Sequence, residues 1–315
     1  MAHVTTKYDQ TGVSPTRETP VPSLSADLLV SLRPDQWTKN LFVFAGLVFG
    51  EQLLDAGAVA RSCATFTIFC ALSSAMYLVN DLRDRTRDRL HPVKASRPIA
   101  AGRVSPAAAA TVAGLLLAFG ILGAFLLGPA MGVLAVAFVV LLTLYTWTLK
   151  DIVILDVLAI AIGFVMRAVA GAVALEVAIS QWLLVCTLLL ALFLGLTKRR
   201  QEVVALGADA TRHRPVLARY SPALLDQMVT IVAGATLVSY AVYTTSPDTV
   251  AEFGTDLLTL TIPFPIYGVL RYLMLIDDDR SAPGPTDILL RDRPLAACIV
   301  GWGLAVAAII YRPFA

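Results

Sequence analysis

The stretch SCATFTIFCALSSAMYLVNDLRDRTRDRLHPVKASRPIAAG, residues 62–102, changes from apolar to densely charged near Val79. Its first part, residues 62–79, has the length and apolarity that a helix needs to cross the hydrocarbon core of a bilayer. The residues from Asn80 onward alternate acids with bases, a pattern that belongs at an aqueous boundary. We therefore expect a transmembrane helix whose end reaches one membrane surface at about residue 80.

The same apolar pattern recurs along the whole chain of 315 residues. Hydrophobic residues make up 57% of it and charged residues only 15%, which excludes an ordinary soluble globular protein. Nine apolar runs of suitable length predict spans at 40–58, 62–79, 107–127, 130–149, 152–175, 178–197, 224–245, 257–276 and 294–312. The first run is the weakest, because Glu51, Gln52 and Asp55 interrupt it. The predicted fold is all-α: a polytopic membrane protein whose nine transmembrane helices surround a cavity that faces the cytoplasm.

The cations of the connecting segments predict the orientation in the membrane. They gather after the second, fourth, sixth and eighth spans, for example at Arg103, Lys150, Arg214 and Arg280, whereas the other connections hold little beyond Arg61. Because cationic loops stay in the cytoplasm, we expect a multi-pass plasma-membrane protein with a cytoplasmic N-terminus. Residues 1–27 lack periodicity and are predicted to form a disordered cytoplasmic tail, which leaves residues 28–315 as the transmembrane domain.

Three carboxylates lie at the end of the second span. Asp81, Asp84 and Asp88 are spaced i, i+3 and i+7, so a helix places them on one face. Hard carboxylate oxygens without His or Cys suit Mg²⁺, which commonly shares its coordination with phosphate oxygens. The alternative is a solvated helix end whose aspartates pair with the arginines between them. Lys94 and Arg97, in the Pro-bounded loop that follows, favour the metal interpretation, because cations beside a metal suit a pyrophosphate ester.

These residues resemble a known family. The run Asn-Asp-x-x-Asp-x-x-x-Asp, formed here by Asn80, Asp81, Asp84 and Asp88, is similar to the first motif of the UbiA superfamily of intramembrane prenyltransferases. The resemblance extends from about residue 28 through most of the chain, in span number as well as in motif. It implies that the three aspartates are catalytic and hold Mg²⁺, with Asn80 assisting.

The region after the sixth span departs from the aromatic-acceptor members of that superfamily, which carry a second Asp-rich motif there. The sequence reads LTKRRQEVVAL at 196–206, with a single carboxylate, Glu202. This pattern resembles the decaprenyl-phosphate phosphoribosyltransferase branch, as do RPDQWTKN at 33–40 and LRDR at 290–293. The resemblance implies transfer of 5-phosphoribose from phosphoribosyl pyrophosphate to a polyprenyl phosphate, with release of pyrophosphate, for arabinose-donor and cell-wall biosynthesis.

Two strongly anionic substrates need several cations on the aqueous side. The predicted substrate-binding residues are Asn80, Lys39, Lys94, Arg97, Tyr145, Lys150, Lys198, Arg199, Glu202 and Arg291. For any single cation, the preference of basic residues for the cytoplasmic side is an equally good explanation, and Tyr145 also fits an interfacial aromatic. The expected partners are phosphoribosyl pyrophosphate, the polyprenyl phosphate and the bilayer. We expect no nucleic acid, and a homo-oligomer is a further hypothesis.

Two other functions fit parts of the sequence. A prenyltransferase of the same superfamily would join a prenyl diphosphate to an aromatic or other small acceptor, but it would need the absent second acidic motif. A transporter or scaffold would place ligands at mid-membrane depth, whereas the densest charges here are interfacial. Asp156, Arg167 and Arg271 are charges inside predicted spans, and each is expected to face a polar partner or cavity.

Overall fold

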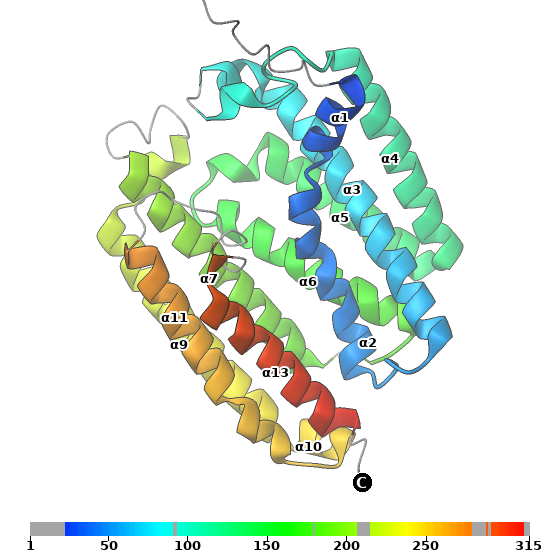
Figure 1. Cartoon of the computed structure of the whole chain (residues 1–315), viewed down its shortest axis with the longest axis vertical. Helices are drawn as coiled ribbons and strands as arrows, with labels where there is room; N and C mark the ends of the chain where they lie inside the picture. The colour runs from blue at the N-terminus through cyan, green and yellow to red at the C-terminus, as the bar shows by residue number, and fades with distance from the viewer. Residues whose placement is uncertain are drawn as a thin grey trace, which may run out of the picture.

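The computed structural model describes residues 23–90, 93–178, 180–206, 215–278, 288 and 291–311. All its regular elements in these ranges are helices, arranged as a ring of long rods (Figure 1). The predicted tail therefore lies mostly outside the described residues, and helix α1 (Leu24–Leu32) begins four residues before the predicted domain. The all-α prediction is confirmed.

Eight helical segments are long and apolar enough to cross a membrane. They are Ala56–Arg89 (α3), Pro106–Leu127 (α4), Pro129–Trp147 (α5), Leu155–Leu175 (α6), Gln181–Ala205 (within α7, Gln181–Leu206), Pro222–Thr245 (α9), Leu257–Asp277 (η6, Leu257–Thr261, followed by α11, Pro263–Asp278) and Arg293–Tyr311 (α13). The predicted count of nine is therefore not confirmed for the described part of the chain.

The difference lies in the first predicted span, 40–58, which is not one helix. A 3₁₀ segment, η1 (Pro34–Phe44), leads into the short helix α2 (Ala45–Phe49), and a turn then separates α2 from α3. Glu51 adopts a left-handed backbone at φ 55°, and the Asp55 carboxylate accepts a hydrogen bond from the Ala58 N–H at 2.6 Å. These polar residues end one helix and cap the next, which is why the apolar run breaks. In Figure 1, α1, η1 and α2 together still descend beside the whole length of α3.

Small residues seat this broken N-terminal segment against α6. A Cβ atom at Gly46 would lie 2.8 Å from the Ala172 nitrogen, and one at Gly171 would lie 2.8 Å from the Val43 carbonyl carbon. Helices in lipid associate largely by such close backbone packing. The contact fixes η1, and with it the polar residues that η1 carries, against the inner helices.

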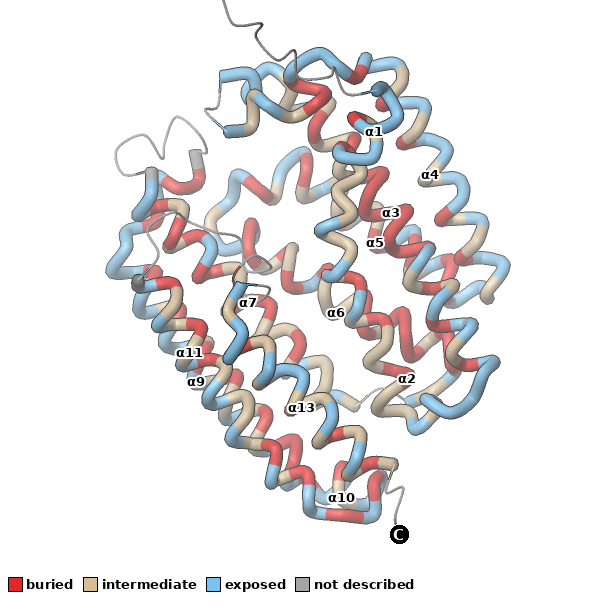
Figure 2. Tube along the Cα trace, in the orientation of Figure 1, coloured by how far each residue is buried: buried red, intermediate tan, exposed pale blue. Residues whose placement is uncertain are grey.

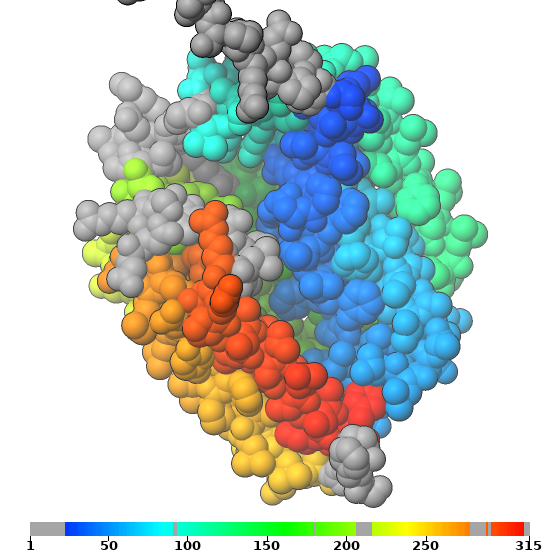
Figure 3. Space-filling view, in the orientation of Figure 1, coloured from blue at the N-terminus to red at the C-terminus, as the bar shows by residue number. Residues whose placement is uncertain are grey.

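The ring closes at the end where α3 begins. The Tyr311 hydroxyl at the end of α13 donates to the Leu47 and Val48 carbonyls at 3.1 Å and accepts from the Leu53 N–H at 3.0 Å. Toward the other end, Figure 3 shows the surface hollowed between the blue N-terminal residues and the red α13, with green residues from the middle of the chain lying deeper.

The helices bury the residues on their inward sides and expose those on their outer sides. Figure 2 shows buried positions along the inward side of α3 and α6, whereas the outer sides of α4 and α13 are largely exposed. Exposed residues there include Leu122, Leu126 and Leu304, as expected for helices that face lipid hydrocarbon. The polar residues described below are the exception to an apolar interior.

Candidate active site

The last turns of α3 carry the acidic motif, and they remain helical to Arg89 as the spacing predicted. Asp81 and Asp88 are each 4% exposed although they lie near a helix end. Buried carboxylates require cationic or hydrogen-bonding partners, because desolvation of an unpaired charge is unfavourable. The identity of those partners decides between a functional cluster and a solvated helix end.

The partners of Asp81 and Asp88 come from other segments. The Arg33 Nη2 group donates to Asp81 Oδ1 at 2.6 Å, and the Arg97 Nη1 group donates to both Asp81 Oδ1 at 3.1 Å and Asp88 Oδ2 at 2.7 Å. Arg33 sits in a left-handed backbone at φ 55°, between α1 and Pro34. Such strain in a residue other than glycine persists where surrounding contacts hold it, and it concentrates at functional sites.

Asp84 has a different partner, Lys150, in the 3₁₀ turn η3 (Leu149–Asp151). The Lys150 Nζ group donates to both Asp84 oxygens, at 2.8 and 2.7 Å, and to Asn80 Oδ1 at 3.4 Å. Lys150 is only 7% exposed, so this ion pair is largely withdrawn from water. The contact brings the end of α5 and the start of α6 against the acidic end of α3.

The arginines within the motif do not pair with its aspartates in the described part of the chain. Arg83 donates to the Trp147 carbonyl at 3.0 Å, and Arg89 donates to the Ala100 carbonyl at 2.9 Å. Three segments outside α3 therefore converge on the aspartates, and they supply Arg33, Arg97 and Lys150. This arrangement argues against the solvated helix end.

The donor set suits a hard divalent cation, although the described residues contain no group of three acidic, His or Cys side chains close enough to hold one. Asp81 and Asp88 already share one cationic group, Arg97, so their oxygens face a common positive centre. Mg²⁺ prefers this oxygen chemistry. The three aspartates therefore have the right chemistry for such a metal, but Arg97 and Lys150 would have to turn away before the carboxylates could gather around it.

The end of α7 supplies a second polar cluster around Arg199, which is 3% exposed. Its Nε group donates to Asp156 Oδ2 at 2.7 Å, and its Nη1 group donates to Glu202 Oε2 at 2.5 Å. Asp156 is fully buried and also accepts from the Tyr220 hydroxyl at 2.9 Å. The guanidinium is therefore locked between two carboxylates on α6 and α7.

Tyr220 also fixes the turn that presents Asp156. Its hydroxyl accepts the Ile154 N–H at 2.7 Å, and Ile154 has φ 69°, an outlier for a β-branched residue. Burial raises the pKa of Tyr220 to about 12, so the phenol stays protonated and can donate to the carboxylate.

The remaining predicted residues divide into two groups. Lys39, Tyr145 and Lys198 lie near one another: Lys198 is exposed, Lys39 and Tyr145 are partly exposed, and Lys198 is within electrostatic range of Glu202, Lys39 and Tyr145. Lys94 begins the 3₁₀ turn η2 (Lys94–Ser96), three residues before Arg97. Arg291 is exposed just before α13, and no hydrogen bond joins it to the aspartates within the described residues.

The sequence interpretation omitted three residues that the structure places at the site. Arg33 binds Asp81, Asp156 binds Arg199, and Tyr77 lies under the Arg33 guanidinium, whose Cζ is 4.9 Å from the ring centroid. Arg33 opens the motif RPDQWTKN and could have been selected on that ground. Asp156 was recognised as an intramembrane charge, but its partner lies 43 residues away.

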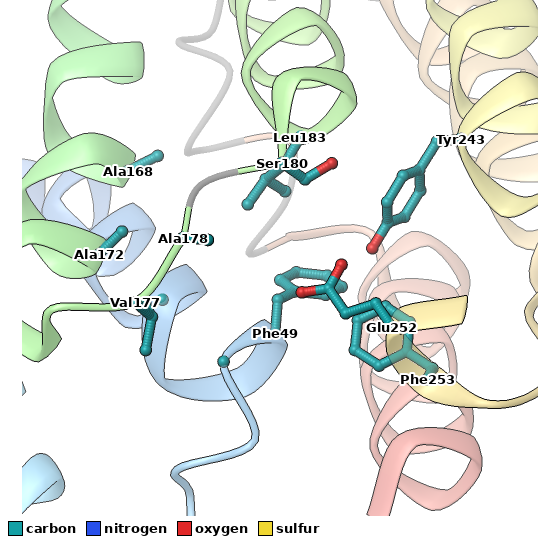
Figure 4. A pocket seen from close by; sticks show the side chains of 12 residues that line it. Phe49, Ala168, Ala172, Val177, Ala178, Ser180, Leu183, Tyr243, Glu252 and Phe253 are labelled. Carbon is teal, nitrogen blue, oxygen red and sulfur yellow. The ribbon is translucent and has the colours of Figure 1, made fainter. Parts of the chain in front are cut away.

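A separate small cavity lies at the opposite end of the helices. Figure 4 shows Phe49, Tyr243 and Glu252 beside it, together with small residues such as Ala168 and Ala172. Phe49 ends α2, at the end of the ring where α3 begins. This cavity is therefore distinct from the polar site at the other end of α3.

Comparison with known sequences supports one family. The profile of the UbiA prenyltransferase family matches residues 40–286. A decaprenyl-phosphate phosphoribosyltransferase from Mycolicibacterium smegmatis is 33% identical over 307 residues, which cover 93% of this chain and 95% of that protein. One from Mycobacterium tuberculosis is 31% identical over 295 residues, covering 92% and 96%.

Comparison with solved structures supports the fold. The structure of a UbiA homolog from Archaeoglobus fulgidus bound to GPP and Mg²⁺ aligns with a TM-score of 0.71 and 18% identity, covering 90% of this chain and 99% of that one. With a family profile over most of the sequence and relatives above 30% identity along nearly its full length, the chain belongs to the UbiA prenyltransferase family.

Proposed function

We propose that this protein transfers 5-phosphoribose from phosphoribosyl pyrophosphate to a polyprenyl phosphate of the decaprenyl type and releases pyrophosphate. The observation that carries the proposal is the second polar cluster. There, Arg199 forms ion pairs with both Asp156 and Glu202. The two carboxylates therefore bind a cationic side chain at the position where a second acidic motif would bind a metal for a prenyl diphosphate. The names of the two mycobacterial relatives support the same activity.

The donor binds at the end of α3 in this proposal. Asp81, Asp84 and Asp88 hold Mg²⁺, which neutralises charge on the pyrophosphate leaving group when it is bound. Arg97 and Lys150 exchange their carboxylate contacts for phosphate oxygens, a change from one charge-assisted hydrogen bond to another. Asn80, which directly precedes Asp81, and Lys94, three residues before Arg97, complete the donor side in this proposal.

Transfer then needs no nucleophilic side chain. The bond between ribose C1 and the pyrophosphate oxygen breaks, the electron pair leaves with pyrophosphate, and the lipid phosphate oxygen forms the new bond to C1. The ribose passes through an oxocarbenium-like state, which the nearby carboxylates stabilise electrostatically. A phosphate monoester is already ionised near neutral pH, so no strong general base is required.

The proposed orientation places the acidic end of α3 in the cytoplasm of a plasma-membrane protein. The connections at that end carry Arg97, Arg103, Lys150 and Arg219, whereas the other end carries Glu51, Asp248 and Glu252. This asymmetry follows the positive-inside rule, and phosphoribosyl pyrophosphate is a soluble intracellular metabolite class. A product of this kind would supply arabinose-donor synthesis for a cell wall.

Prenyl transfer to a small acceptor is the second candidate, because the family profile and the GPP-bound structural relative both favour it. The test uses purified protein, Mg²⁺, ribose-labelled phosphoribosyl pyrophosphate and decaprenyl phosphate, with label counted in the organic extract. The proposal predicts a labelled lipid that EDTA prevents. Product only from a prenyl diphosphate and an aromatic acceptor would establish the second candidate instead.

A further inference from the structure

Four polar side chains from four segments lie close enough to act on one another electrostatically. Lys39 comes from η1, Tyr77 from α3, Tyr145 from α5 and Lys198 from α7. Lys198 lies within electrostatic range of Lys39 and Tyr145, and Tyr77 lies within range of Tyr145. Lys198 is exposed, and Lys39, Tyr77 and Tyr145 are partly exposed, although they belong to the segments that line the ring.

The two lysines differ from the other cations near the site. Arg33, Arg97 and Arg199 each form a short ion pair with a carboxylate. For Lys39 and Lys198, the described residues offer no hydrogen bond and no ion pair. Glu202 lies within electrostatic range of Lys198, and Asp35 within range of Lys39, yet the two ammonium groups still repel each other. A bound anion between them would remove that repulsion.

Arg167 adds positive charge near Lys39, but its own donors are engaged within the protein. Its Nε group donates to Asn40 Oδ1 at 2.6 Å and its Nη1 group to the Gly163 carbonyl at 2.7 Å. Its guanidinium carbon also lies 4.8 Å from the centroid of Phe138. Arg167 is 6% exposed, and Lys39 lies within its electrostatic range. It therefore strengthens the positive field while its own donors stay occupied.

Tyr77 and Lys198 lie one helical turn deeper than the carboxylates of Asp81 and Glu202, which we call the carboxylate layer. Tyr77 precedes Asp81 by four residues on α3, and Lys198 precedes Glu202 by four residues on α7. One helical turn corresponds to a rise of about 5–6 Å along the axis. Both helices run toward the same end of the ring (Figure 1), so Tyr77 and Lys198 lie below the carboxylates. Together with Lys39 and Tyr145, which lie within electrostatic range of Lys198, we call them the floor.

We propose that Lys39, Lys198, Tyr77 and Tyr145 form a binding site for a phosphate monoester, and that this phosphate belongs to the lipid acceptor. This inference rests on the proposed function and assigns its two substrates to separate layers. Two ammonium groups and two hydroxyls match a phosphate dianion, which accepts several hydrogen bonds. The deeper position favours the lipid, whose phosphate is tethered to a chain in the hydrocarbon core, over the 5-phosphate of a water-soluble donor.

The two layers also suit the bond changes of the reaction. With pyrophosphate bound at the carboxylate layer and the acceptor phosphate at the floor, ribose C1 lies between the leaving and the attacking oxygens. The C1–O bond to pyrophosphate then breaks on one side while the C1–O bond to the lipid phosphate forms on the other. Correct placement of two reactants supplies much of the rate enhancement in such reactions.

The kinetic test uses Lys39→Gln, Lys198→Gln and Tyr77→Phe in full-length protein. The matched control is Arg61→Gln, which removes an exposed cation at the opposite end of the ring. Each lysine variant should raise the KM for decaprenyl phosphate about tenfold or more, because a charge-assisted hydrogen bond is lost. The KM for phosphoribosyl pyrophosphate should change less than about twofold. A rise confined to the donor KM would assign the site to the 5-phosphate and overturn the proposal, as would unchanged values for both substrates.

A binding measurement separates this inference from the proposed function, since it needs no turnover. Thermal unfolding of wild-type protein is followed with decaprenyl phosphate, with decaprenol and with phosphatidylglycerol. We expect stabilisation by decaprenyl phosphate alone, and we expect Lys39→Gln to lose it while Arg61→Gln keeps it. Equal stabilisation by decaprenol or phosphatidylglycerol would overturn the site. If wild type binds the lipid phosphate in this way but makes no phosphoribosyl lipid, the proposed function fails and the site stands.

Discussion

Gly171→Ala tests how firmly the N-terminal segment is seated on α6. A Cβ atom at this position would lie 2.8 Å from the Val43 carbonyl carbon and would overlap the carbonyl oxygen. Restoring ordinary van der Waals contact requires η1 to retreat by roughly 1 Å or more. Overpacking of this kind costs about 1–3 kcal/mol. The same retreat stretches the 2.6 Å hydrogen bond from Arg167 to Asn40, which contributes about 1–3 kcal/mol more.

The expected loss is therefore about 2–6 kcal/mol in the free energy of unfolding. It is measured in one detergent by SDS titration or thermal unfolding, with tryptophan fluorescence as the signal. Gly114→Ala on α4 is the matched control, because a Cβ atom there meets nothing within 4 Å. The control should change stability by less than about 1 kcal/mol, in the stabilising direction. Equal stability of the two variants would refute the argument that close backbone packing seats η1.

Three further predictions concern the polar clusters. Asp84→Asn should nearly abolish turnover while the helical circular dichroism persists, whereas Asp151→Asn, at an exposed position in η3, should retain activity. Full activity of Asp84→Asn would remove the metal role. Asp156→Ala should destabilise the protein by about 3–5 kcal/mol in SDS titration, because it leaves the charge of Arg199 buried without this partner. Tyr220→Phe, which removes one hydrogen bond to Asp156, should cost about 1 kcal/mol. Unchanged stability of Asp156→Ala would contradict the buried pair. Removal of divalent metal with EDTA should stop phosphoribosyl transfer and added Mg²⁺ should restore it, so metal-independent turnover would exclude the proposed donor site.

The acidic face of α3 could be predicted from the sequence because its geometry is local. A spacing of three and four residues on a helix fixes which side chains share a face, whatever the rest of the chain does. The break in the first predicted span was signalled by Glu51 and Asp55, but an apolar count over a window averages such residues away. Only the structure shows that Asp55 caps α3.

The partners of the acidic face could not be derived from spacing. Arg33 lies 48 residues before Asp81, and Lys150 lies 66 residues after Asp84. Which cation reaches which carboxylate depends on how the helices close into a ring. The positive-inside rule accounts for basic residues near this surface without selecting among them. Within the described residues, Arg97 forms ion pairs with two aspartates whereas Lys39 and Lys198 form none, and this contrast likewise depends on packing.

The most direct test of the central claim is a double-label transfer assay with purified wild-type protein. Phosphoribosyl pyrophosphate carries ¹⁴C in the ribose and ³²P in the β-phosphate, and decaprenyl phosphate and Mg²⁺ are added. The account predicts that ¹⁴C moves into the organic extract while ³²P remains in the aqueous phase as pyrophosphate. If neither label enters the lipid, while the same preparation couples geranyl diphosphate to an aromatic acceptor, the phosphoribosyl account is contradicted.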